Sequence, residues 1–122
     1  MKLQFLETTY SVCQIARHTS IPDWASSYMA VIRTDDETTI ITATDSVPET
    51  VKAEHNFACF RVTGKLEFDM IGVIAAISQV LAESEIPILS VSTYNTDYFL
   101  ISNAKLDLAR LTLHRAGYEI LN

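Results

Sequence analysis

The stretch ILSVSTYNTDYFLIS, residues 88–102, is typical of a β-hairpin. Two runs rich in apolar residues flank a polar turn, and no charged residue occurs between Pro87 and Asn95. The turn then carries a single carboxylate, Asp97. A strand with so little charge favours burial on both faces or a position at a subunit boundary. We therefore expect residues 88–94 to begin a central strand that pairs with its neighbour across this turn.

The segments on either side of this hairpin predict two helices and two further strands. Residues 58–63 alternate between polar and apolar side chains, as in a half-buried strand. Apolar residues recur at helical spacing over residues 72–85 and again over residues 106–116, and residues 118–121 supply a closing strand. The order β-α-β-β-α-β and the handedness rule for crossovers predict an α+β fold over residues 57–122. This is the ferredoxin-like arrangement, an antiparallel four-stranded sheet with two helices on one face.

Residues 1–56 form a β-rich half without a convincing first helix. Strands are expected at residues 10–15, 28–34 and 38–44, the last of which is rich in β-branched side chains. This half reads either as a degenerate copy of the unit at 57–122 or as extra strands that extend the same sheet. Both interpretations are compatible with the sequence.

Composition excludes several classes of partner. The chain has 122 residues, 48% of them hydrophobic, which suits one compact domain or two small interlocked ones. Nine Lys and Arg against 15 Asp and Glu give a net charge of −6, which opposes binding to nucleic acid or to anionic lipid. No apolar run is long enough to span a membrane, and Met1–Glu7 lacks the apolar core of a signal peptide. We therefore expect a cytoplasmic protein in which Cys13 and Cys59 are buried free thiols.

The residue patterns give little support to metal binding or catalysis. The three histidines, at 18, 55 and 114, lie in unrelated segments, and neither cysteine has a neighbouring ligand, so we expect no metal and no cofactor. No Gly-x-Ser-x-Gly motif is present. A ferredoxin-like fold can hydrolyse phosphate esters, but the loop at residues 64–69 carries two acids where a phosphate would need cationic or amide groups.

Binding of a small zwitterion is the chemistry that the hairpin and the first helix favour. Asp97 on the turn would face the start of the helix that opens near Asp69 and Gly72, where free backbone amides lie. A free α-amino acid carries the complementary pair of charges. The alternative is purely structural: Asp69 caps the helix, Gly72 allows close packing, and Asp97 is solvated.

Several segments resemble an ACT domain, and together these segments extend over nearly the whole chain. In the second half they are residues 60–66, 68–77 and 88–100, of which the sequence Ser92-Thr93-Tyr94-Asn95-Thr96-Asp97 is the most specific. More narrowly, the chain resembles the small stand-alone bacterial ACT proteins that are related to the CASTOR arginine sensors and to the regulatory ends of aspartate kinases. The first half adds similarity at residues 10–13, 21–24, 31–41 and 47–49.

That resemblance implies a free amino acid bound at the junction of two ACT units, within one chain or between chains. The site residues that it implies, together with their neighbours, are Asp69, Met70, Ile71, Gly72, Val73, Thr93, Tyr94, Asn95 and Asp97. The arginine sensors have an acid facing the guanidinium where this chain has Met70, so specificity for arginine does not carry over. The Asp-Pro-Gly sequence of many ACT domains is replaced here by Asp-Met-Ile-Gly.

The sequence thus predicts a non-catalytic module that senses an amino acid and forms a homodimer. Dimerisation is expected because the apolar strand at residues 88–91 would be prone to aggregation at a bare sheet edge. Two alternatives remain, namely an oligomerisation module with no ligand and a weak hydrolase on the same fold.

Overall fold

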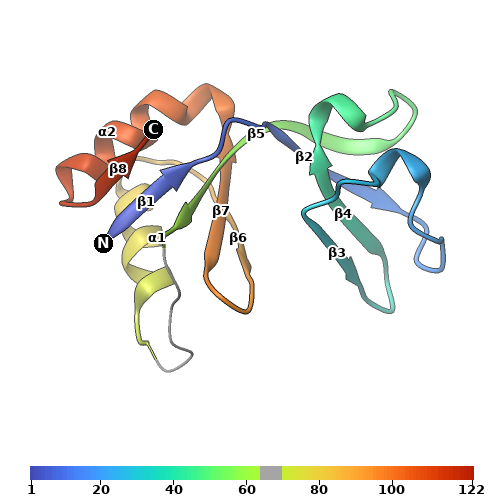
Figure 1. The fold of residues 1–122 in the computed structure, drawn as a ribbon, viewed down its shortest axis with the longest axis horizontal. Helices are drawn as coiled ribbons and strands as arrows, with labels where there is room; N and C mark the ends of the chain where they lie inside the picture. The colour runs from blue at the N-terminus through green and yellow to red at the C-terminus, as the bar shows by residue number, and fades with distance from the viewer. Residues whose placement is uncertain (64–69) are drawn as a thin grey trace. The chain divides into compact units, whose positions relative to one another are not determined.

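A computed structural model describes residues 1–63 and 70–122 of the chain (Figure 1). The chain divides into two compact units. The larger unit combines Met1–Glu7 with Ala58–Asn122, and the smaller one is Thr8–Phe57. Strand β5 (Lys52–Val62) belongs to the smaller unit in its first part and to the larger unit in its second part. The two units are described separately below.

The larger unit contains the predicted β-α-β-β-α-β order, which confirms the α+β fold class. After β5 come α1 (Val73–Glu83), β6 (Leu89–Ser92), β7 (Asp97–Ser102), the short 3₁₀ helix η3 (Asn103–Lys105), α2 (Leu106–Arg115) and β8 (Glu119–Leu121). The expected helices and strands therefore form within a few residues of their predicted bounds.

The N-terminal strand β1 (Lys2–Phe5) adds a fifth strand that the sequence did not predict. The order is β6-β7-β5-β1-β8, so β1 lies between the two strands that a four-stranded sheet would place side by side. It pairs antiparallel with β5, where Leu3 is opposite Val62, and parallel with β8, where Leu3 is opposite Ile120. Residues 2–5, which we had grouped with the N-terminal half, thus belong to the sheet of the larger unit.

Both helices pack on one face of this sheet. Ile77 and Leu81 of α1 and Ala109 and Leu113 of α2 share a single buried cluster with side chains from the strands. On the sheet side, the cluster includes alternate residues of three strands: Leu3, Phe5, Ala58, Phe60, Val62, Phe99 and Ile101. Phe60 stacks on Phe99 with ring centroids 5.1 Å apart. The apolar side chains that alternate along the strands and those that recur at helical spacing therefore pack together in one core.

Strand β6 lies at the edge of the described sheet, so our prediction of a central strand is wrong, and of the two alternatives for its apolar character, burial on both faces is not observed. It pairs only with β7 among the described strands, because the second strand of a β-α-β-β-α-β unit lies outermost. Leu89 is 42% exposed, and Ser90 and Ser92 are exposed as well. The apolar character of this strand is therefore compatible with the other possibility, a subunit boundary.

The smaller unit is a four-stranded antiparallel sheet in the order β3-β4-β2-β5. Its strands β2 (Tyr10–Ile15), β3 (Ala30–Arg33) and β4 (Thr38–Ala43) match the predicted segments. Residues 8–57 contain the short 3₁₀ helices η1 (Asp23–Ala25) and η2 (Thr44–Ser46) but no α-helix, as expected. A separate small core forms around Cys13, Ala25 and Ile40.

Candidate functional site

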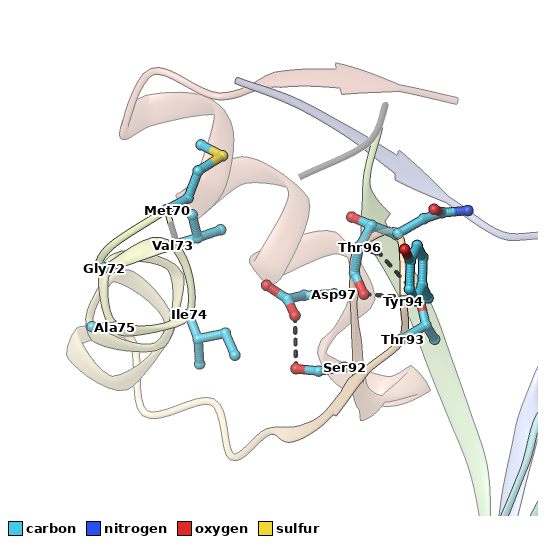
Figure 2. A pocket seen from close by; sticks show the side chains of 11 residues that line it. Met70, Gly72, Val73, Ile74, Ala75, Ser92, Thr93, Tyr94, Thr96 and Asp97 are labelled. Carbon is cyan, nitrogen blue, oxygen red and sulfur yellow. Dashed lines mark hydrogen bonds between the residues drawn. The ribbon is translucent and has the colours of Figure 1, made fainter. Parts of the chain in front are cut away.

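A cleft of about 400 Å³ lies in the larger unit, between the start of α1 and the hairpin that joins β6 to β7 (Figure 2). Figure 2 shows Ser92 and Asp97 pointing from the hairpin toward the helix, and Ile74 pointing back toward them. The lining residues are Met70, Gly72, Val73, Ile74, Ala75, Ser92, Thr93, Tyr94, Asn95, Thr96 and Asp97.

The helix side of the cleft offers hydrogen-bond donors. Gly72, the residue before α1, has a φ of 84°, a left-handed conformation that glycine adopts without strain. The first described helical hydrogen bond runs from the Ala76 amide to the Gly72 carbonyl, at 2.9 Å. The amides of Val73, Ile74 and Ala75 precede it and bond to no acceptor within residues 1–63 and 70–122. Gly72 has no side chain to cap them, so they can serve an anion.

The tip of the hairpin is closed by hydrogen bonds of its own threonines. The Thr93 amide donates to the Thr96 carbonyl at 2.8 Å, and the Thr93 hydroxyl donates to the same oxygen at 3.0 Å. The hydroxyl of Thr96, which is buried, donates to the Val62 carbonyl on β5 at 2.7 Å. Both hydroxyl protons are therefore engaged in holding the turn and are not free for a ligand.

The hairpin side of the cleft carries a negative charge. Ser92 and Asp97 are directly opposite one another where β6 ends and β7 begins, and the Ser92 hydroxyl donates to Asp97 Oδ1 at 2.7 Å. Asp97 is half-buried and forms no ion pair with any residue of the described part of the chain. The described lining contains no Lys, Arg or His. Donors on the helix thus face a carboxylate on the hairpin for which the described residues supply no counter-charge.

Comparison with models of known families matches residues 52–115 to the ACT domain. The chain belongs to the ACT domain family. A second family model, for an N-terminal domain, matches residues 8–50. No curated protein matches the sequence.

Solved structures show the same fold as this ACT protein. One is a protein from Agobacterium tumefaciens, 29% identical, with a TM-score of 0.91 over 98% of this chain and 91% of the other. Another is a protein of unknown function from Vibrio cholerae, described as a possible transport protein, 20% identical with a TM-score of 0.79 over 93% and 88% of the two chains. A third is the regulatory subunit of aspartate kinase from Thermus flavus, 12% identical with a TM-score of 0.67 over 95% and 97%.

The cleft of this ACT protein brings together seven of the nine residues that the sequence proposed. They come from the two segments named for the site: Met70, Gly72, Val73, Thr93, Tyr94, Asn95 and Asp97. Ile71 does not line the cleft and is 98% exposed, and Asp69 lies outside the described residues. Whether the seven bind a ligand remains a prediction.

Four lining residues were not among those proposed: Ile74, Ala75, Ser92 and Thr96. The first two follow Val73 on the first turn of α1. Ser92 could have been found from strand alternation, because it is the cross-strand partner of Asp97 in a hairpin with a turn at residues 93–96.

Other features of this ACT protein bear on metal binding and on membranes. Within residues 1–63 and 70–122, no three His, Cys, Asp or Glu side chains are grouped as a metal site would require. No helix in that part of the chain is both long and apolar enough to cross a bilayer.

Cys13 and Cys59 are free thiols and both are buried. Burial raises the pKa of Cys59 from 9.0 to about 12, since the core would leave a thiolate unsolvated.

Proposed function

We propose that this ACT protein is a non-catalytic regulatory module that binds a free amino acid in the cleft between α1 and the β6–β7 hairpin. The observation that carries this proposal is the opposed polarity of the two walls. Backbone amides of the first turn of α1 lie on one side, and the carboxylate of Asp97, which forms no ion pair with the described residues, lies on the other.

The polarity fixes an orientation for the ligand. Its carboxylate would accept hydrogen bonds from the amides at Val73, Ile74 and Ala75, where the helix dipole also favours negative charge. Its ammonium would lie against Asp97, whose Oδ2 makes no hydrogen bond with the described residues. Charge-assisted hydrogen bonds at both ends are the strong kind.

Membership of the ACT family supports a regulatory role, because the fold of this chain is that of the regulatory subunit of an aspartate kinase. Catalysis is not part of the proposal. The described lining of the cleft holds no His, Cys, Lys or Arg that could act as acid, base, nucleophile or anion stabiliser beside Asp97.

We further propose that two copies of the chain associate and that the second copy covers the open side of the cleft. Support comes from β6, an uncharged edge strand whose Leu89 is 42% exposed. Strand pairing between copies across a twofold axis would cover it. We place the dimer in the cytoplasm, where the two unpaired thiols would stay reduced.

The experiment is a thermal-shift screen of the twenty amino acids on the parent protein, Asp97→Ala and Asp36→Ala. Asp36 is the matched control, an exposed acid in the turn between β3 and β4. At about 100 times its dissociation constant, a ligand should add about 2.7 kcal/mol of stability, which is a shift of several degrees. Asp97→Ala should abolish the shift and Asp36→Ala should keep it. A parent protein that responds to none of the twenty would instead support a structural oligomerisation module.

A further inference from the structure

We infer that Ser92 is a positioning residue of the cleft, which holds the carboxylate of Asp97 toward α1 and leaves the pair of Ser92 and Asp97 able only to accept hydrogen bonds from a ligand. The inference rests on the proposed function and extends it, because it says how the site distinguishes an ammonium from other groups. Ser92 would act on the ligand mainly through Asp97.

The hydrogen bond between these two side chains has only one direction. An ionised carboxylate has no proton to donate, so the proton in the 2.7 Å contact belongs to Ser92. The remaining lone pairs on Ser92 Oγ, like those on Asp97 Oδ2, can only accept. The hydroxyl protons of Thr93 and Thr96 are already donated to the Thr96 and Val62 carbonyls. The hydroxyl groups of Ser92, Thr93 and Thr96 thus offer no free proton to a ligand.

Strand geometry explains why Ser92 can fix Asp97. The two residues form a directly opposed pair next to the turn of the hairpin, so both side chains leave the same face of the sheet. Figure 2 shows this pair on the side that faces α1, with the apolar side chain of Ile74 opposite. Ile74 offers no hydrogen bond, and no cation among the described residues holds Asp97 in place. Among the described residues, only Ser92 has a side chain that holds the carboxylate in this orientation.

The pair of Ser92 and Asp97 can only accept hydrogen bonds, so it favours a ligand group that only donates. An ammonium meets this condition with its N–H groups, whereas a hydroxyl or a carboxylate at the same point adds lone pairs that face those of Asp97. The cleft should therefore discriminate between an amino acid and the hydroxy acid of the same shape. Removal of the Ser92 hydroxyl should reduce this discrimination, because Asp97 is then free to turn toward solvent.

The test is a double-mutant cycle on the full chain, with the twenty amino acids as probes and calorimetry as the readout. For the best-binding amino acid, Ser92→Ala should weaken binding by about tenfold, a size typical of one charge-assisted hydrogen bond. Ser92→Thr, which keeps the hydroxyl, should restore most of the affinity. In an Asp97→Asn background, Ser92→Ala should change the affinity little, because the group that it positions is no longer charged. Additive effects of the two substitutions, or no loss in Ser92→Ala, would overturn the inference.

Two controls separate a positioning role from a structural one. Ser90→Ala removes a hydroxyl from the same strand and the same face, where Ser90 makes no hydrogen bond through its side chain to the described residues, and it should leave the affinity unchanged. The second control compares L-alanine with L-lactate, which differ in the group at Cα. The parent should prefer L-alanine, and Ser92→Ala should lose part of that preference. A loss of affinity for both ligands in equal measure would contradict the inference.

Failure of the proposed function gives a different result. If the parent binds none of the twenty amino acids, that function is wrong, and the positioning role is then decided in the ligand-free protein. A crystal structure of Ser92→Ala in which Asp97 turns away from α1 supports the role. The same orientation of Asp97 with and without the hydroxyl refutes it.

Discussion

The hydroxyl of Thr96 donates a 2.7 Å hydrogen bond to the carbonyl of Val62, and both residues are buried. This contact ties the tip of the β6–β7 hairpin to strand β5, 34 residues away in sequence. Thr96 also accepts, through its own carbonyl, the amide and hydroxyl protons of Thr93. The position of the hairpin that forms one wall of the cleft therefore depends on the buried side chain of Thr96, which need not contact a ligand itself.

Replacing Thr96 with Val should destabilise the fold by about 1–3 kcal/mol, because the buried Val62 carbonyl loses its hydroxyl donor while the shape of the side chain is kept. Urea unfolding measures the loss. Asn95→Ala, at the exposed neighbouring position, should change the stability by less than about 0.5 kcal/mol. Equal stability of Thr96→Val and the parent would mean that the contact contributes nothing.

Two buried threonines on β4 should respond in opposite ways to the same substitution. Thr42 Oγ1 is buried and has no hydrogen-bond partner among the described residues, whereas Thr38 Oγ1 donates to the Arg17 carbonyl at 2.9 Å. Thr42→Val removes an unsatisfied group and should raise the free energy of unfolding by about 1 kcal/mol. Thr38→Val should lower it by about 1–3 kcal/mol. Chemical denaturation of both variants would reveal the contrast. A lower free energy of unfolding in Thr42→Val than in the parent would show that the Thr42 hydroxyl does form a hydrogen bond.

Cys59 makes the stability depend on pH in the alkaline range. Burial raises the pKa of the thiol from 9.0 to about 12, although a backbone hydrogen bond at Phe99 opposes the shift. Above about pH 9 the unfolded chain releases this proton and the folded chain keeps it, so stability falls as the pH rises toward 12, by up to about 1.4 kcal/mol per unit. Below about pH 9 the thiol is protonated in both the folded and the unfolded chain, so its full contribution to the stability is present.

The difference between the parent and Cys59→Ala isolates this effect, because the other groups that titrate above pH 9 are common to both. Denaturation at several pH values should show a shallower decline in the variant. At neutral pH, Cys59→Ala or Cys13→Ala should cost about 1–3 kcal/mol through lost packing and leave amino-acid affinity unchanged. A variant that keeps its stability but loses affinity would place that thiol in the binding site.

The spacing of apolar residues was enough to predict most of the helices and strands, because each element shows this spacing within its own short segment. The helical spacing of Ile77 and Leu81 and the alternation through Phe60 correctly indicated which faces meet in the core. Strand β1 was missed because its position between β5 and β8 is a non-local property of the chain. Its own alternation, in which Leu3 and Phe5 are buried and Lys2 is exposed, is too short to indicate which strands it joins.

The candidate site was predictable in outline for a similar reason. Gly72 and Asp97 were identified by residue type, and the fold then brought both into one cleft. Ile71 was expected beside them, but it lies before the left-handed turn at Gly72 and points into solvent, 98% exposed. Ser92 belonged to the segment of most specific resemblance but was not among the site residues that we proposed, because a serine alone does not indicate a role in a site. Its significance comes from a side chain across the hairpin.

Self-association through β6 can be tested by adding a charge to that strand. Leu89 is 42% exposed, so Leu89→Lys should be tolerated by the monomer. A lysine on the edge opposes pairing between copies, because strand addition would bury its charge. Light scattering at micromolar concentration should give about twice 13.6 kDa for the parent and the monomer mass for the variant. A parent protein that is monomeric at this concentration contradicts the dimer.

The side chain of the ligand should be neutral. Among the described lining residues, Asp97 is the only charged side chain, so this part of the lining can pair one cation. Arginine brings two, its ammonium and its guanidinium, and Met70 offers the second one an apolar surface. A cation that loses water without gaining a partner costs free energy. The matched probe is citrulline, which has nearly the same shape and no charge on its side chain. Calorimetry should show that citrulline binds more tightly than arginine by about tenfold or more, equivalent to about 1.4 kcal/mol.

Met70→Glu should reverse that preference. Met70 lies at the edge of the cleft and is 46% exposed, so a carboxylate at this position keeps its hydration and should not unfold the protein. It would supply the second acid that a guanidinium needs. Arginine should then bind more tightly than citrulline, while a small neutral amino acid should lose little, since its ammonium still pairs with Asp97. If the parent already prefers arginine to citrulline, Asp97 is facing the side chain of the ligand and the ammonium lies elsewhere.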